Sequence, residues 1–459
     1  MRVADSLGWF EREGAMALRD EARGIFADAM RAVRIDAVMQ REIRCVNGVL
    51  HVKGLTYRLA EFERLVVVAM GKAAGPMADG VLSALRGAGV ALEGVVVGAT
   101  APTNVDARVR FFEGSHPIPD ERSAEVADAG LELLGRCDER CLVLVLLSGG
   151  ASSMVERPLS VTMTMGDAAE LHRALVHSGL AIGEMNALRK HFSAVKGGRL
   201  AVAARGATMC TLIVSDVPPG AMDVVGSGPT VPDATTVETC REILREAGET
   251  LGLTARLRAY FGDPDLLETP KAGDVVFAKA DAVMLLSSDD LCAAACASAA
   301  AMGFAVVVDN GCDEWEYRAA SEYLLGRAEA LAREHERVCV VSAGEVSVMV
   351  QGAHGRGGRN QQFVLECARL AVERGLAVTV LSAGSDGIDG NSPAAGGVVD
   401  GTTVERARAM GLSVEDALEQ FDSYGLLVAL GDVIVTGATG NNLRDLRLVL
   451  VERVPQVGM

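Results

Sequence analysis

The sequence predicts an α/β protein of two domains, and three observations support this. The chain has 459 residues, more than a single core commonly holds. Hydrophobic residues make up 49% of it but aromatic residues only 4%, so Val, Leu, Ala and Ile must build the core, as in buried parallel strands covered by helices. Short apolar runs also alternate with segments of helical periodicity, which is typical of an open parallel sheet.

The first half of the chain follows this alternation. An amphipathic helix is predicted over residues 11–46, because apolar side chains recur there at helical spacing. Strands are then predicted at 65–70, 95–98, 142–147 and 209–215, and helices at 78–85, 123–134, 167–177 and 184–192. We therefore expect a Rossmann-like, three-layer N-terminal domain with a parallel sheet.

The second half repeats the pattern after a stretch rich in Gly and Pro, residues 256–274, which we interpret as a connection. Strands are predicted at 282–287, 305–309 and 338–342, and helices at 291–302, 315–334 and 361–371. With the boundary placed near residue 265, the N-terminal domain covers residues 1–265 and a C-terminal α/β domain covers residues 266–459.

Charge and hydropathy exclude several classes of partner. The formal net charge of −17 argues against nucleic acid and anionic membranes, both of which would repel the protein. Mean hydropathy is +0.24, yet the apolar runs are too short to span a bilayer, and the N-terminus lacks the apolar core of a secretory signal. We expect a cytoplasmic protein.

Cysteine spacing supports the same compartment. None of the ten cysteines forms a Cys-x-x-Cys pair. Cys137/Cys141 and Cys292/Cys296 lie one helical turn apart without a neighbouring His, which favours buried thiols over a metal site.

Two glycine-rich turns of the N-terminal half are candidate ligand sites, because ligands of open α/β sheets bind beyond the carboxyl ends of the strands. Lys72 follows a strand within MGKAAG and is either a phosphate-binding cation or a solvated loop lysine. Gly149, Gly150 and Ser152 follow the next apolar strand within SGGASS, which suits a phosphate cradle or an ordinary helix cap.

Two further segments of this half contain charges that suit phosphate chemistry. Residues 184–200 hold four cations in an otherwise acidic protein and include Lys196-Gly197-Gly198, which predicts either an anion site or a solvated helix face. Asp216 follows the strand TLIV, where a carboxylate either holds Mg²⁺ near phosphates or stabilises a turn.

The C-terminal half contributes a cation and two carboxylates. Arg359 precedes a predicted helix, and its guanidinium suits a carboxylate or phosphate. Asp386 and Asp389 lie three residues apart among glycines and suggest a metal or hydroxyl contact, unless both segments are surface loops. Glycine-rich turns, isolated cations and carboxylates are together the set that phosphoryl transfer requires.

Seven segments in order, within residues 65–452, resemble the glycerate 2-kinases that carry a MOFRL-type C-terminal domain. They are VVVAMGKAAGPMA, GSHPIPDERS, LLSGGASSM, EMNALRKHFSAVKGGRLA, LIVSDVPPG with GSGPTVPD, GRGGRNQQF, and SAGSDGIDGNSPAAGGVVD. The resemblance implies ATP-dependent phosphorylation of D-glycerate, or a related small hydroxy acid, at its 2-hydroxyl to give 2-phosphoglycerate and ADP. It also implies a divalent metal and two α/β domains with a cleft between them.

The resemblance also implies roles for individual residues. Lys72 and Arg359 match the family's essential cations, and Asp216 and Asp386 are candidates for the Mg²⁺ ligand or the base, with no choice between them. The other implied contacts are Gly149, Gly150, Ser152, Lys196, Gly197 and Gly198 for ATP, and His116, Asn186 and Arg189 for the hydroxy acid. Nucleotide and acid are then the partners, with a homo-oligomer left open.

Two alternatives remain open. One is an NAD(P)-dependent hydroxypyruvate reductase, although no Gly-x-Gly-x-x-Gly fingerprint follows a strand. The other is a non-catalytic sensor of sugar acids or nucleotides, against which the retained Lys72 and Arg359 argue.

Three segments depart from the family pattern. They are VPPGAMD at 217–223, where the family has Val-Pro-Gly-Asp-Asp, AGEVS at 343–347 and GATGNN at 437–442. If the loop 218–223 borders the acceptor site, its lost carboxylate predicts an altered preference among acids. If the loop faces solvent, it varies freely.

Overall fold

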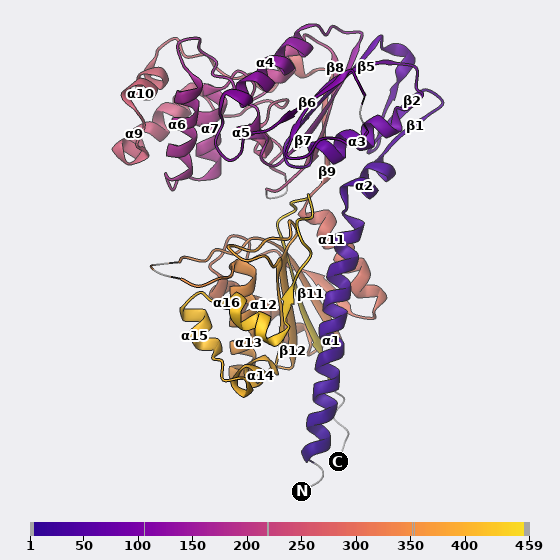
Figure 1. Cartoon of the computed structure of the whole chain (residues 1–459), viewed down its shortest axis with the longest axis vertical. Coiled ribbons are helices and arrows are strands. Elements are labelled where there is room, and N and C mark those ends of the chain that lie inside the picture. The colour runs from indigo at the N-terminus through magenta and orange to yellow at the C-terminus, as the bar shows by residue number, and fades with distance from the viewer. Residues whose placement is uncertain (1–3, 105, 218–219, 351, 353, 454–459) are drawn as a thin grey trace. The chain divides into compact units, whose positions relative to one another are not determined.

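The protein, described here by a computed structural model covering residues 4–104, 106–217, 220–350, 352 and 354–453, folds as two compact units (Figure 1). The middle unit is Ile35–Leu286, and the terminal unit combines Met1–Arg34 with Ser287–Met459. This division differs from the expected one at residue 265. Residues up to 286 complete the first sheet, and the first helix packs with the C-terminal elements.

A six-stranded parallel sheet forms the centre of the middle unit and confirms the predicted α/β class. Its strands lie in the order β6-β5-β4-β7-β8-β9, and all neighbours are parallel. The strands are β4 (Arg64–Met70), β5 (Ala91–Gly98), β6 (Val109–Glu113), β7 (Cys141–Ser148), β8 (Thr208–Val214) and β9 (Ala280–Leu286). β7 is buried along its whole length, as its run of Leu and Val predicts.

Helices cover this sheet and form a second apolar cluster beside it. α3 packs on β4, β5 and β7, whereas α4 contacts β4, β5 and β6. Four helices, α6, α7, α9 and α10, gather at one end of the unit (Figure 1) around their own core. The helices are α2 (Ile35–Glu42), α3 (Ala74–Ala84), α4 (Glu121–Gly135), α5 (Ala151–Met154), α6 (Met165–Val176), α7 (Ile182–Phe192), α8 (Arg199–Ala203), α9 (Val237–Ala247) and α10 (Ala255–Gly262).

The single helix predicted over residues 11–46 is wrong. α1 (Ala4–Ala32) ends before α2, and a small antiparallel sheet of β1 (Ile43–Val46), β2 (Val49–Val52) and β3 (Leu55–Arg58) follows. Asn47 and Gly48 both have positive φ and turn β1 into β2. Asn-Gly between apolar strands is a strong hairpin signal that outweighs helical periodicity. The connection expected at 256–274 likewise begins with a helix, α10.

The terminal unit contains a mixed six-stranded sheet in the order β10-β11-β15-β12-β13-β14. β10 and β11 are parallel, and β15 runs antiparallel to both β11 and β12. The strands are β10 (Ala305–Val308), β11 (Arg337–Gly344), β12 (Val378–Gly384), β13 (Gly396–Asp400), β14 (Val433–Ile434) and β15 (Asp445–Glu452). Asp445, the first residue of β15, therefore lies between the carboxyl ends of β11 and β12, opposite Gly344 and Gly384.

Helices lie on both faces of this sheet. α1 and α11 pack on one face of the sheet, and α12 and α13 pack on the other face (Figure 1). The helices are α11 (Ser288–Ala301), α12 (Tyr317–Leu331), α13 (Arg359–Arg374), α14 (Thr403–Ala409), α15 (Val414–Glu419) and α16 (Ser423–Leu430). Arg19 of α1 forms ion pairs with Asp400 and Asp432, which fastens this helix to the unit.

All ten cysteines are free thiols. Among the helices within the described ranges, none combines the length and apolar character needed to cross a membrane.

Candidate active-site residues

In the middle unit, two glycine-rich turns lie side by side because β4 and β7 are parallel neighbours, with Met70 opposite Leu147. Lys72 N donates to Gly149 O at 2.9 Å, and Ala73 N donates to Ser148 Oγ at 3.0 Å. The segments MGKAAG and SGGASS, about 75 residues apart in sequence, thus form one structure at the carboxyl edge of the sheet.

Lys72 is exposed at this edge, and within the described part of the chain no carboxylate lies at ion-pair distance from it. Gly150 has a φ of +85°, and a Cβ there would lie 3.1 Å from His116 Cδ2 and 3.3 Å from Lys72 Cγ. Glycine is therefore needed both for the backbone and for this close approach. Burial and the charge of Lys72 lower the pKa of His116, so this imidazole is neutral at pH 7.

Asp216 joins the same edge two residues after β8 ends. A Cβ on Gly149 would collide with the Asp216 carboxylate, so this side chain lies directly against the glycine turn. The structure thus gathers Lys72, His116, Gly149, Gly150 and Asp216, which the sequence spreads over 145 positions. We name this group the lysine cluster.

A chain of polar contacts extends from this edge to α7. Ser152 Oγ lies 3.0 Å from Ser227 Oγ, which donates to Asn186 Oδ1 at 3.0 Å. Asn186 Nδ2 and Arg189 Nε are buried, and neither has a hydrogen-bond partner within the described structure. Buried donors of this kind are normally satisfied, so both are suited to a ligand. Ser227 belongs to the segment GSGPTVPD, which was singled out from the sequence without a separate role for this residue.

Lys196 has a different environment. Its side chain is 1% exposed and forms an ion pair with Glu156, which also contacts His172 at 3.3 Å. Gly197 N and Gly198 N donate to Ser227 O and Gly228 O. These partners are all internal, so the geometry favours a structural role for Lys196, Gly197 and Gly198 over direct nucleotide contact.

The neighbours of Lys196 have strongly shifted pKa values. Burial alone would raise the pKa of Glu156, but Lys196 and His172 outweigh it and lower that pKa to about 2. Burial lowers the pKa of His172 to about 4 although Glu156 opposes this. At neutral pH the carboxylate is thus ionised and the imidazole neutral.

The loop that departs from the family pattern is only partly visible. Pro218 and Pro219 lie outside the described residues. Asp223 accepts from Lys190 Nζ at 2.9 Å, and Asp233 accepts from the same ammonium at 3.0 Å. Asp223 is therefore engaged with α7, and the expected effect of this loop on acid preference stays a prediction.

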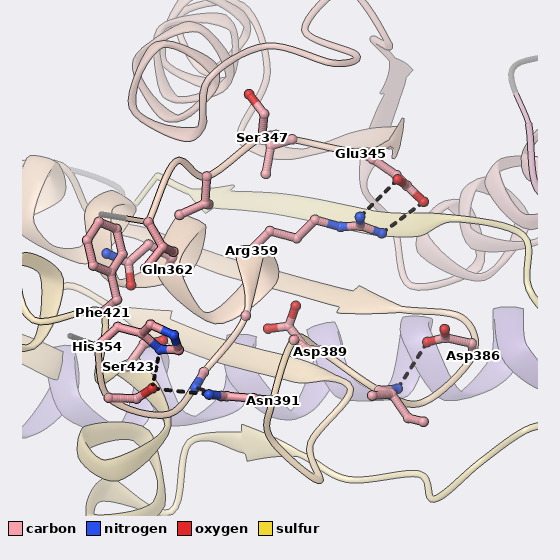
Figure 2. Close-up of a pocket in the computed structure, with 18 of the residues that line it drawn as sticks. Glu345, Ser347, His354, Arg359, Gln362, Asp386, Asp389, Asn391, Phe421 and Ser423 are labelled. Atoms are coloured by element: carbon pink, nitrogen blue, oxygen red, sulfur yellow. Dashed lines mark hydrogen bonds and ion pairs between the residues drawn. The ribbon is translucent and has the colours of Figure 1, made fainter. Parts of the chain in front are cut away.

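The terminal unit has a pocket of about 810 Å³ beyond the carboxyl ends of β11 and β12 (Figure 2). It is lined by Glu314, Glu345, Ser347, His354, Gly358, Arg359, Gln362, Asp386, Asp389, Asn391, Phe421, Ser423 and Arg444, among others. Arg359 and Asp386, both singled out from the sequence, line this pocket, which contains four carboxylates and two guanidinium groups.

Arg359 lies between two carboxylates. Its Nε donates to Asp445 Oδ2 at 2.6 Å and its Nη2 to Asp445 Oδ1 at 3.1 Å. On the other edge, Nη1 donates to Glu345 Oε2 at 2.9 Å and Nη2 lies 2.8 Å from Oε1, a contact visible in Figure 2. Burial would lower the pKa of Arg359, but the two carboxylates outweigh it and raise that pKa. The guanidinium is permanently charged, and both of its two-donor edges are paired with carboxylates.

Asp389 and Asp386 differ in what they can do. Asp389 accepts from the backbone and side chains of Asn360 and Gln361, so it caps the start of α13. Burial and the nearby Asp445 raise the pKa of Asp389 to about 6. Asp386 is half-buried and accepts from Ile388 N at 3.0 Å (Figure 2). Thr439 of the divergent segment 437–442 donates its N–H to Asp386 O.

Charged residues of β15 were missed at the sequence level. Besides Asp445, Arg447 is fully buried and donates to Gly344 O and Ala343 O at the end of β11. Arg444 pairs with Asp313 at 2.6 Å. A strand reading DLRLVLVE, with Asp and Arg two apart on one face of an apolar run, could have indicated a buried polar site.

Residues 21–262 match a family described as a domain of unknown function (DUF4147), and residues 338–445 match the MOFRL family. A glycerate 2-kinase of Pyrococcus horikoshii is 30% identical over 95% of this chain and 98% of its own length. A protein of Agrobacterium vitis that carries the provisional name hydroxypyruvate reductase is 36% identical over 84% of this chain and 87% of its own length.

A solved structure shows the same relationship. The crystal structure of a glycerate kinase from Thermotoga maritima superposes with a TM-score of 0.81 at 30% identity and covers 95% of this chain and 100% of its own.

Proposed function

Since the chain belongs to the glycerate kinase family, we propose that it is an ATP-dependent kinase of D-glycerate or a closely related small hydroxy acid. It would phosphorylate the 2-hydroxyl and release 2-phosphoglycerate and ADP. The observation that carries this proposal is the lysine cluster, in which an exposed, unpaired ammonium stands beside glycine turns at the end of a parallel sheet.

Phosphoryl transfer needs positioning and charge neutralisation more than covalent catalysis. In this proposal, Lys72 stabilises the negative charge on the transferring phosphoryl oxygens, and the close approach permitted by Gly149 and Gly150 lets backbone reach them. The acid's 2-hydroxyl oxygen bonds to the γ-phosphorus as the bond to ADP breaks. The hydroxyl proton passes to a carboxylate, for which Asp216 and Asp386 are the candidates. His116, being neutral, is suited to a hydrogen bond with the acid.

ATP and Mg²⁺ belong to the same proposal. Among the described residues, no three His, Cys, Asp or Glu side chains are grouped to hold a metal. This fits Mg²⁺ in kinases, where one or two carboxylates share the ion with phosphates and water. Asp216 or Asp386 would hold it, and when bound it supplies charge neutralisation between the phosphates. Free thiols suit a cytoplasmic reaction.

A coupled assay of ADP release across a panel of small hydroxy acids tests the function. We expect turnover with D-glycerate or a close relative, and a product phosphorylated at the 2-position by NMR. Failure of every acid to release ADP would overturn the kinase assignment.

The reductase is the second candidate, and the name of the Agrobacterium vitis relative favours it. Hydroxypyruvate-dependent oxidation of NADH or NADPH, measured by absorbance without ATP, would identify it. Ligand binding without either reaction would identify a sensor.

A further inference from the structure

The ion-pair arrangement around Arg359 leaves no free edge for an anionic ligand. A guanidinium has two edges that offer paired N–H groups to a carboxylate or phosphate. Asp445 occupies the Nε/Nη2 edge and Glu345 occupies the Nη1/Nη2 edge. Binding of an anion by two N–H groups of Arg359 therefore requires one carboxylate to leave.

The two carboxylates are not equally replaceable. The Asp445 side chain is 2% exposed and fixed at the start of a central strand, opposite Gly344 and Gly384. Removing its partner would leave a buried charge uncompensated, which is strongly unfavourable. The Glu345 side chain is 33% exposed and lines the pocket. Burial raises the pKa of Glu345 even though Arg359 opposes this, so ionised Glu345 is poorly stabilised where it lies.

We propose that Glu345 is the exchangeable partner of Arg359 and sets the affinity of Arg359 for a ligand carboxylate. Glu345 occupies the Nη1/Nη2 edge in the free protein, and the carboxylate of the hydroxy acid takes this edge when it binds. A ligand carboxylate reproduces the planar, two-oxygen geometry of the Glu345 carboxylate. The identity of the ligand as a hydroxy acid rests on the proposed function, but the exchange at Arg359 does not.

This exchange gives Glu345 a defined effect on affinity. Each ligand carboxylate must compete with a protein carboxylate that is always present, so Glu345 weakens binding of small anions. Only an acid with further contacts in the pocket, such as hydrogen bonds to its hydroxyl groups, would bind well. Glu345 would thus keep simple carboxylates such as acetate, which lack those further contacts, from occupying the site at low concentration.

The Glu345→Gln variant of the full-length protein tests the proposal, because the amide keeps the shape but removes the competing charge. Calorimetric titration with sodium acetate, D-glycerate and inorganic phosphate gives the dissociation constants, and thermal denaturation confirms folding. We expect both carboxylates to bind about threefold to tenfold more tightly than to wild type, the range for loss of a half-buried ion pair. Phosphate should also bind more tightly, because the same guanidinium edge accepts either anion.

Two further variants keep the test decisive. Glu314→Gln removes the same charge from the same pocket, and Glu314 makes no ion pair with Arg359 in the described structure. Equal tightening in this control would assign the effect to the pocket's overall field and overturn the exchange. Glu345→Ala should tighten binding in the same direction if the Gln variant folds poorly. Unchanged or weaker carboxylate binding in a folded Glu345 variant would also overturn it.

The outcomes separate this inference from the proposed function. Acetate titration reports the exchange whether or not the protein is a kinase, whereas ADP release reports the kinase whether or not Glu345 leaves. If the protein releases ADP but the Glu345 variants bind carboxylates no more tightly, only the inference fails.

Discussion

The two singled-out cations have opposite environments. Lys72 is exposed beside glycine turns and has no carboxylate partner among the described residues, whereas Arg359 is half-buried between Asp445 and Glu345. An unpaired cation can meet a phosphate without breaking any contact. A paired one must first exchange a partner. The comparison therefore supports the proposal that Lys72 meets the transferring phosphoryl charge and that Arg359 binds the ligand carboxylate.

Lys72→Ala should have the largest effect on turnover. Loss of an electrostatic contact to a transferring phosphoryl group costs about a hundredfold or more in kcat. Because the Lys72 ammonium pairs with no carboxylate in the part of the chain that the structure describes, the melting temperature should be unchanged. Lys279→Ala, which removes an exposed lysine at the opposite edge of the same sheet, is the matched control. Near-normal turnover in folded Lys72→Ala would remove Lys72 from the site.

Arg359→Lys should reduce turnover by about a hundredfold, close to the loss in Arg359→Ala, because a misplaced ligand reacts poorly. An ammonium cannot hold Asp445 and a second carboxylate in two planar pairs. Arg359→Ala should also lose stability, by about 3–5 kcal/mol, because buried Asp445 is left unpaired. Denaturant titration and steady-state kinetics measure the two effects. A Lys variant that retains most activity would show that Arg359 acts only as a diffuse charge.

Gly150→Ala should reduce turnover about tenfold, a smaller loss than removal of a charged group. The added methyl would press on Lys72 and His116, and positive φ adds about 1–2 kcal/mol of strain. Gly179→Ala is the matched control, because Gly179 has a φ of +72° with open space around its Cβ position. If both variants lose the same stability but only Gly150→Ala loses turnover, the loss of turnover comes from the contact with Lys72. Equal turnover in both variants would contradict it.

Substitution of His172 should have the smallest effect on turnover, because the imidazole of His172 contacts Glu156, which is paired with Lys196 inside the protein. Its pKa is lowered to about 4 from 6.5, so unfolding takes up a proton in this range. Stability should therefore be complete above pH 6.5 and fall by roughly 3 kcal/mol as the pH falls to 4. His172→Gln should flatten this pH dependence without changing kcat at neutral pH. The control His177→Gln, at an exposed position, should leave the pH dependence as it is. Chemical denaturation at several pH values checks this.

The sequence predicted the parallel sheet because continuous apolar runs such as LVLVLL fit a buried strand better than a loop or an exposed helix. It also located Lys72 and Gly150, because their turns follow such runs directly. It did not reveal the partners of Arg359. Asp445 lies 86 residues away, and its contact depends on an antiparallel pairing that local periodicity does not encode. Apolar spacing predicts too long a first helix, because it does not register the Asn47-Gly48 turn, where both residues have positive φ.

The buried ion pair of Lys196 shows another limit of prediction from the sequence. A run of cations in sequence does not reveal whether each is solvated or paired, since that depends on Glu156, 40 residues away. The same segment contains both unpartnered Arg189 Nε and fully paired Lys196. Residue type predicted the charge, and only the fold assigned its partner.

The strand order of the terminal unit also has a consequence for how the protein is made. β15, which ends at Glu452, follows the other described strands of its sheet in the chain, yet it lies between β11 and β12 near the middle of that sheet. The first helix, α1, packs on elements that begin after residue 287. During translation the middle unit can therefore fold first, while α1 waits with its apolar face uncovered. The Arg359 ion pairs, which need Asp445, form only after β15 has been inserted between β11 and β12.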